Sequence, residues 1–180
     1  MWPIGGRVHQ KNALPPWNFY ANNFMTTIRL PHEFLTFLRL LNQSGSKYLL
    51  IGGYAVAHYG YVRATGDMDV FVECSKENAR TLTDACKEFG LGDSVSEETF
   101  LVPGQILRFG LPPMRLEILN EISGVSFEDC WKSKKELQVE GITIPIISLE
   151  DLLKNKRASG RTKDQIDIEQ LTDSDSFPQN

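Results

Sequence analysis

Apolar residues along the chain repeat with two different periods, and these periods predict strands and helices in alternation. Short apolar runs and period-two runs predict β-strands at residues 48–51, 68–73, 106–109, 114–119, 136–139 and 142–146. Helical spacing of apolar residues predicts helices at residues 31–41, 54–59, 75–89, 127–131, 148–158 and 162–171. The stretch from Gly90 to Gly104 shows neither period and is expected to be rich in loops.

Capping patterns mark the starts of the last two predicted helices. Ser148 is followed by Asp151 three residues later, which is a variant of the capping box. Thr162 and Gln165 have the same spacing and predict a second box. We therefore expect Ser148 and Thr162 to stand at the helix N-termini.

The pattern also predicts where the folded unit begins and ends. Residues 1–24 hold three prolines and two tryptophans without periodicity, and we expect an irregular N-terminal arm, with Met25 as an alternative natural start. Residues 25–172 are expected to form one domain whose C-terminal helices begin at about residue 148, because 180 residues suit a single full core. Residues 173–180 are expected to be a polar tail.

Two carboxylates share one predicted strand. Asp67 and Asp69 are two positions apart, so on a strand they project from the same face, opposite to Met68 and Val70. Two neighbouring anions indicate a cation between them, and Mg²⁺ prefers such oxygen ligands. The competing interpretation is that both aspartates are solvated residues on a sheet edge.

A third acidic residue strengthens the metal interpretation. Glu117 lies in the predicted strand 114–119 and faces opposite to Leu116 and Ile118. If this strand neighbours the strand of Asp67 and Asp69, three carboxylates converge. Such a set can hold two divalent ions in phosphoryl or nucleotidyl transfer.

Glycines and basic residues supply candidate phosphate contacts. Gly52 and Gly53 follow a strand and open a helix, where backbone N–H groups can hold phosphate; a simple tight turn is the alternative. Arg63 and Thr65 precede the aspartates and could orient them, contact phosphate or serve the loop alone. A basic cluster follows later in the chain, and it could contact phosphate or be a solvated helix end: Lys154, Lys156, Arg157, Arg161 and Lys163.

Composition narrows the possible classes of function and the expected cellular location. The net charge of −4 argues against a general nucleic-acid-binding protein. Cys74, Cys86 and Cys130 form no C-x-x-C pair and are expected to be reduced thiols. The sequence shows no apolar run long enough to span a membrane and no secretory signal pattern, so we expect a cytoplasmic protein.

Taken in order, these motifs resemble a known superfamily. Ile51-Gly52-Gly53 followed by Asp67-Met68-Asp69-Val70 is similar to the signature of DNA polymerase beta-like nucleotidyltransferases. The run GGYAVAHYGYVRATGDMDV resembles small bacterial nucleotidyltransferases, some of the abortive-infection or type IV toxin–antitoxin type. Residues 122–131 and 147–171 resemble the later motifs of this group. Glu117 departs from the pattern, since aspartate is the commoner third acid.

The resemblance implies a fold and an activity. The fold is α+β, with a mixed β-sheet flanked by helices and a C-terminal helical segment. The activity is transfer of a nucleoside monophosphate from an NTP to an acceptor with release of pyrophosphate. Two Mg²⁺ ions, or Mn²⁺, would be held by Asp67, Asp69 and Glu117, with Glu117 also helping to deprotonate the acceptor. Lys156 and Arg161, which match the K-x-x-x-x-R element, would contact the triphosphate.

The sequence leaves the acceptor and one rival function open. The acceptor could be an aminoglycoside-like small molecule, a tRNA end or a protein hydroxyl. The rival is a non-catalytic nucleotide- or partner-binding module of a defence system, with an antitoxin as its partner.

Overall fold

The computed structural model describes residues 28–111 and 114–173, apart from the side chain of Asp93. The predicted arm at 1–24 lies outside the described residues, as does the tail beyond Asp173. The proposed domain boundaries at these two ends therefore stay predictions.

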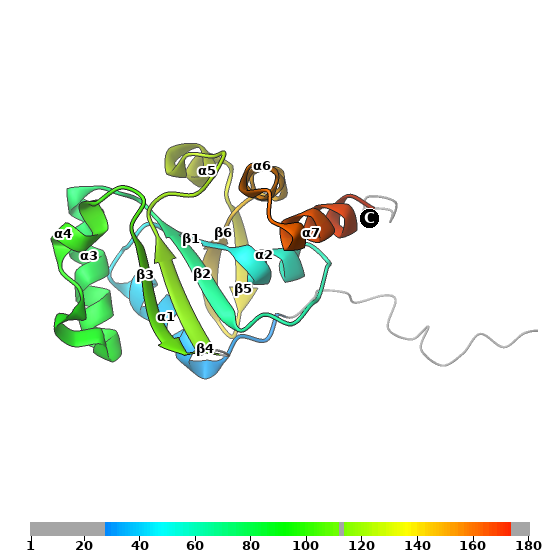
Figure 1. Cartoon of the computed structure of the whole chain (residues 1–180). Helices are drawn as coiled ribbons and strands as arrows, with labels where there is room; N and C mark the ends of the chain where they lie inside the picture. The colour runs from blue at the N-terminus through cyan, green and yellow to red at the C-terminus, as the bar shows by residue number, and fades with distance from the viewer. Residues whose placement is uncertain (1–27, 112–113, 174–180) are drawn as a thin grey trace, which may run out of the picture.

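A six-stranded mixed sheet forms the centre of the molecule, in the order β3-β4-β2-β1-β6-β5 (Figure 1). β2 pairs in parallel with β4 and β1 with β6, whereas the other three pairings are antiparallel. The strands are β1 (Tyr48–Ile51), β2 (Asp67–Val72), β3 (Ile106–Leu111), β4 (Met114–Leu119), β5 (Lys135–Val139) and β6 (Ile142–Ile146). Each predicted strand is present, and the expected mixed sheet flanked by helices is confirmed.

Helices flank the sheet, and two of them form the C-terminal end of the described chain. They are α1 (His32–Gln43), α2 (Gly52–His58), α3 (Lys76–Cys86), α4 (Glu97–Leu101), α5 (Phe127–Ser133), α6 (Leu149–Ser159) and α7 (Thr162–Asp173). Figure 1 shows α1, α3 and α4 grouped on one side of the sheet, and α5, α6 and α7 on the other. None of the helices in the described part of the chain has the length and apolar character that crossing a membrane requires.

The prediction of loops between Gly90 and Gly104 was wrong in part. A 3-10 turn at Gly92–Ser94 and helix α4 lie within this stretch. α4 begins after Ser96, whose side chain forms a reciprocal capping box with Thr99. Five residues are too few to show the helical period in the sequence, which explains why the pattern did not reveal this helix.

The two predicted caps near the C-terminus had different outcomes. Ser148 caps α6, and its hydroxyl accepts a hydrogen bond of 3.2 Å from the amide of Asp151. Thr162 is instead the first residue of α7. The amides of Asp164 and Gln165 donate to the carbonyl of Arg161, so the chain turns into the helix one residue earlier than the second capping box predicted.

The alternation along β2 divides its side chains between two faces. Met68, Val70 and Val72 are fully buried, whereas Asp67 and Asp69 on the opposite face are only partly buried. Phe71 shares the face of the aspartates further along the strand, where its ring packs edge-on against Phe127 of α5 at 5.1 Å. The sheet thus carries apolar packing on one face, and on the other an acidic patch beside an apolar end.

Candidate active site

The pairing of β2 with β4 sets the acidic residues beside one another. In this parallel register Asp69 lies opposite Glu117, and Asp67 lies opposite Arg115. Residues two apart on a strand share a face, so all four side chains project from the same side of the sheet. The structure therefore places the three predicted carboxylates together, while their catalytic and metal-binding roles stay predictions.

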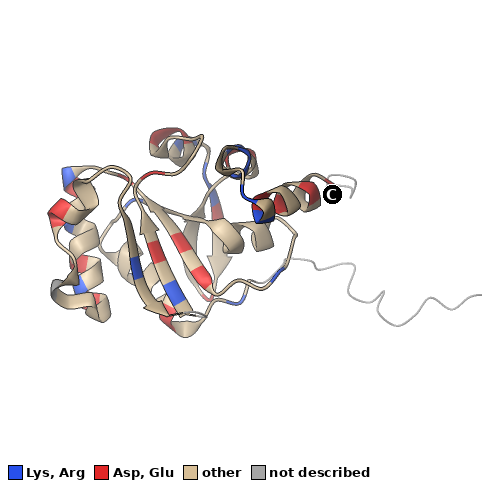
Figure 2. Cartoon of the chain, in the orientation of Figure 1, with Lys and Arg blue, Asp and Glu red and all other residues tan. Residues whose placement is uncertain are grey.

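A cleft of about 610 Å³ lies over this face, within the size range of small-molecule sites. Acidic and basic positions lie side by side on β2, β3 and β4 beneath it (Figure 2). Its walls include every residue that the sequence selected for the site: Gly52, Gly53, Arg63, Thr65, Asp67, Asp69, Glu117, Lys156 and Arg161.

Close approach of side chains explains the two glycines. Gly52 has a φ of +65°, and a Cβ atom there would overlap Oδ2 of Asp69. A Cβ atom at Gly53 would overlap Oγ1 of Thr65. That hydroxyl donates to the carbonyl of Asp67 at 3.3 Å, which is the loop role that the sequence left open for Thr65. The glycines thus let β2 and its preceding loop lie directly against the start of α2.

Asp69 carries the least compensated charge of the site. Burial, and next the neighbouring carboxylates of Glu117 and Asp67, raise its pKa to about 6, against weaker opposing effects of Lys163 and Arg161. Among the described residues, no side chain donates a hydrogen bond to Asp69 or forms an ion pair with it. A cation in this position would relieve the unfavourable charge.

Two arginines bind the other two carboxylates. Nη2 of Arg115 lies 2.7 Å from Oδ2 of Asp67 and 3.0 Å from Oε1 of Glu117. Nε of Arg108, on the neighbouring strand β3, donates to the same Oε1 at 3.0 Å. Glu117 is therefore held between two guanidinium groups, whereas Asp67 is held by one.

Helices α6 and α7 meet through a buried ionic network. Nζ of Lys156 lies 3.0 Å from Oδ1 of Asp164 and 2.6 Å from Oδ2 of Asp167, and all three side chains are almost completely buried. Arg63 donates to both oxygens of Asp167, at 2.7 and 2.9 Å. Lys156 and Arg63 therefore line the cleft while their charges are already paired.

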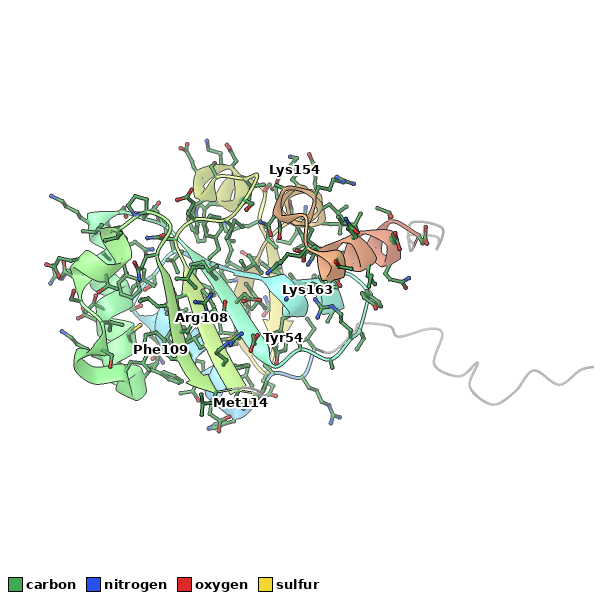
Figure 3. All side chains as sticks on the ribbon, in the orientation of Figure 1. Tyr54, Arg108, Phe109, Met114, Lys154 and Lys163 are labelled. Atoms are coloured by element: carbon green, nitrogen blue, oxygen red, sulfur yellow. The ribbon has the colours of Figure 1, made fainter. Side chains whose placement is uncertain are left out.

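The remaining members of the basic cluster differ in their surroundings. Arg161 donates to Asp164 at 2.6 Å, but 60% of its side chain stays exposed. Lys154 forms ion pairs with Glu150 and Asp151 on its own helix and does not line the cleft. Lys163 lines the cleft, and within the described part of the chain it forms no ion pair. Figure 3 shows Lys163 on α7 and Arg108 on β3, on either side of β2 in this view.

Comparison with known protein families identifies the chain's relatives. A family described as "Nucleotidyl transferase of unknown function" (DUF2204) matches residues 32–176, which include the whole cleft. The chain belongs to this nucleotidyl transferase family. No curated protein matches it.

One of three similar solved structures has a TM-score above 0.5 and agrees with the nucleotidyltransferase fold of this family member. A protein from Thermotoga maritima, inferred to be a nucleotidyltransferase, matches with a TM-score of 0.55 at 17% identity, over 78% of this chain and 91% of its own. The lincomycin-bound lincosamide antibiotic adenylyltransferase LnuA gives a TM-score of 0.48 at 19% identity, over 79% of this chain and 96% of its own. An antigenic nucleotidyltransferase-like protein from Paracoccidioides brasiliensis gives 0.47 at 15% identity, over 78% of this chain and 73% of its own. The first similarity supports the fold alone.

The site of this nucleotidyl transferase family member has the donor chemistry for a divalent ion. Three carboxylates lie on adjacent strands, and the charge of Asp69 is unmatched by any described cation in contact with it. In residues 28–111 and 114–173, however, no three His, Cys, Asp or Glu side chains are arranged so that they could hold a metal ion. The guanidinium group of Arg115 instead forms ion pairs with Asp67 and Glu117.

Sequence reasoning missed several charged residues that line the cleft of this family member or pair with its lining residues. Arg115 and Glu117 are two apart on a predicted strand, and this spacing could have indicated that they share a face. Asp164 and Asp167 are three apart on a predicted helix, a spacing that favours a common partner. No local pattern distinguishes Lys163 from the paired lysines of the cluster, since its lack of a partner depends on how α6 and α7 pack.

Proposed function

We propose that this protein transfers a nucleoside monophosphate from an NTP to an acceptor hydroxyl in a metal-dependent reaction. The observation that carries the proposal is the register of β2 and β4, which sets Asp67, Asp69 and Glu117 on one face beneath the cleft. Membership of the nucleotidyl transferase family supports transfer of a nucleotide in general.

In this proposal the carboxylates hold Mg²⁺, with two ions expected and Mn²⁺ able to replace them. Asp67, Asp69 and Glu117 supply the oxygen ligands. When bound, the ions neutralise the charge that develops on the phosphates during transfer. Asp69 would gain most from a bound ion, because no side chain of the described residues forms an ion pair with it.

In this proposal the triphosphate lies against the turn that opens α2, beside the carboxylates, and against the start of α7. Gly52 and Gly53 expose backbone to the cleft, and Thr65 lies beside them. Arg161 and Lys163 are the cations best able to contact phosphate oxygens, because both are exposed to the cleft. We assign Arg63 and Lys156 a supporting part in nucleotide binding, since Asp164 and Asp167 fix their charges at the edge of the same site.

The proposed reaction forms one phosphorus–oxygen bond and breaks another. The acceptor oxygen attacks the α-phosphorus, and the bond from that atom to the oxygen bridging to the β-phosphate breaks, so pyrophosphate leaves. The acceptor's proton passes to Glu117. Positioning and charge neutralisation supply most of the rate enhancement in such reactions, so few side chains are needed.

The walls of the cleft favour a small polar acceptor. Glu121, Ser123 and Asn155 supply polar groups beyond the acidic residues. Of the described residues that line the cleft, none is aromatic, whereas single-stranded nucleic acids are commonly bound by stacking on aromatic side chains. We therefore place a small molecule ahead of a tRNA end or a protein as the acceptor.

Pyrophosphate release by the purified protein tests this proposal. Each NTP would be supplied with Mg²⁺ and separately with the small-molecule, RNA and protein fractions of a cell extract. The expected result is release that depends on the small-molecule fraction and is lost in Asp67→Asn and Asp69→Asn. Release with RNA or protein instead would change the acceptor class. NTP binding without release from any fraction would favour the non-catalytic binding module.

A further inference from the structure

One guanidinium nitrogen binds two of the three carboxylates proposed as metal ligands. Nη2 of Arg115 lies 2.7 Å from Asp67 and 3.0 Å from Glu117. Asp67 and Arg115 are register partners across β2 and β4, and Glu117 follows Arg115 by two residues on the same face. The backbone pairing of the sheet therefore fixes the place of the guanidinium group between the two acids.

One of the two ion pairs of Arg115 is accessible to water. The side chain of Arg115 is 30% exposed and that of Asp67 is 34% exposed, so water partly screens this pair, whereas that of Glu117 is only 12% exposed. Nε of Arg115 is buried and has no hydrogen-bond partner among the described residues. The buried pair of Lys156 with Asp164 offers the contrast, since both of its charges are shielded from water.

The position of Arg115 leaves the charge of the acidic patch unevenly balanced. Arg115 contacts Asp67 and Glu117 but makes no ion pair with Asp69, which lies opposite Glu117 and two residues from Asp67 on the same face. A divalent cation would need oxygen ligands from the acids that Arg115 now binds. The guanidinium group and the ion therefore compete for the same oxygens.

We propose that Arg115 is a built-in competitor for the metal: its guanidinium group occupies the place between Asp67 and Glu117 until a divalent ion displaces it. The proposal rests on the proposed function, because it concerns the same carboxylates. It implies that Arg115 weakens metal binding in the protein without nucleotide. A guanidinium group released into the cleft can bind phosphate oxygens with its two-pronged donors, so a triphosphate favours the displaced position.

Mn²⁺ binding to the full-length protein without nucleotide tests the proposal directly. The titration would be followed by electron paramagnetic resonance of free Mn²⁺ at pH 7.5. Removing the competing charge in Arg115→Gln is expected to tighten Mn²⁺ binding on the order of tenfold. Asp67→Asn in the same background should abolish the gain, which places the ion at this site.

Arg108→Gln is the matched control, because Arg108 touches Glu117 but not Asp67. It removes the same charge from the same cleft and is expected to change Mn²⁺ affinity by a smaller factor than Arg115→Gln. Equal tightening in both variants would mean that general electrostatics, and not competition at this position, controls the affinity, and would overturn the proposal.

Circular dichroism and thermal unfolding would show whether Arg115→Gln is folded. If it is not, Arg115→Lys decides, because a lysine amine keeps the charge but lacks the planar fork, and it should still tighten Mn²⁺ binding by a smaller factor. Unchanged or weaker Mn²⁺ binding in the folded variant overturns the proposed competition.

The pyrophosphate assay distinguishes failure of this proposal from failure of the proposed function. Turnover with unchanged Mn²⁺ affinity rejects the role of Arg115 as a competitor alone. Tighter Mn²⁺ binding without turnover rejects the proposed function alone.

Discussion

The carboxylate of Asp69 lies so close to Gly52 that any side chain at position 52 would overlap its Oδ2 atom. The strand β2, which bears the two aspartates, thus packs directly against the turn that opens α2 at the contact between Asp69 and Gly52. This contact explains Gly52 without reference to any ligand, and both residues line the cleft.

Replacing Gly52 separates steric overlap from backbone strain. Gly52→Ala is expected to lower the free energy of unfolding by roughly 3 kcal/mol, because alanine is strained at positive φ and its Cβ displaces Asp69. Gly160→Ala is the matched control, since Gly160 has a φ of +66° and no atom within 4 Å of a Cβ. It should cost only roughly 1 kcal/mol. Urea unfolding of both variants measures the difference, and equal costs would show that the contact with Asp69 is unimportant.

Asp69→Asn separates catalysis from folding. The substitution removes a metal ligand and should lower pyrophosphate release by orders of magnitude. Stability should not fall above pH 6, because burial raises the pKa of Asp69 to about 6 and so disfavours the ionised form in the folded protein. Paired turnover and urea measurements at pH 8 check this, with the exposed Asp84→Asn as a control. Near-normal turnover would reject the role of Asp69.

Lys163→Ala tests whether this lysine of the cleft, which forms no ion pair with the described residues, contacts phosphate. Loss of a charge-assisted hydrogen bond should raise KM for the NTP about tenfold with a smaller change in kcat. Lys154→Ala removes the same charge from the neighbouring helix, where Lys154 pairs with Glu150 and Asp151, and should leave KM unchanged. Steady-state kinetics with varied NTP compare the two, and equal effects would argue against a direct contact.

The buried network between α6 and α7 predicts a specific loss of stability in acid. Burial alone would raise the pKa of Asp164, but hydrogen bonds from Arg161, Ser159 and Lys156 outweigh it and lower the pKa to about 2. A depressed carboxylate pKa stabilises the fold above the ordinary value of 3.8, and this contribution is lost as the pH falls from about 4 to about 2.

Urea unfolding between pH 7 and pH 2 measures that contribution. The loss attributable to Asp164 should be about 2 kcal/mol, and Asp164→Asn should be less stable at pH 7 and show a flatter decline below pH 4. An identical acid profile in the variant would contradict the assignment.

Local sequence patterns were sufficient to predict most helices and strands and the strand face that Asp67 and Asp69 share. The two-residue period of a strand places Asp67 and Asp69 on the same side whatever the rest of the chain does. The apolar run at 48–51 and the helical spacing from 31 to 41 likewise predicted β1 and α1. Short helices such as α4 were missed, because their start depends on a single cap.

The sequence by itself determined which residues form strands and helices, and which carboxylates share a strand face, because these properties depend on neighbours a few positions away. Only the tertiary structure decided that Arg115 stands between Asp67 and Glu117, since that depends on the parallel register of β2 and β4, formed by segments about 50 residues apart. It also decided that Lys156 is buried with two aspartates while Lys163 faces the cleft. Both lysines belong to one basic cluster in the sequence, and only the packing of α6 against α7 gives one of them partners and leaves the other free to meet a ligand.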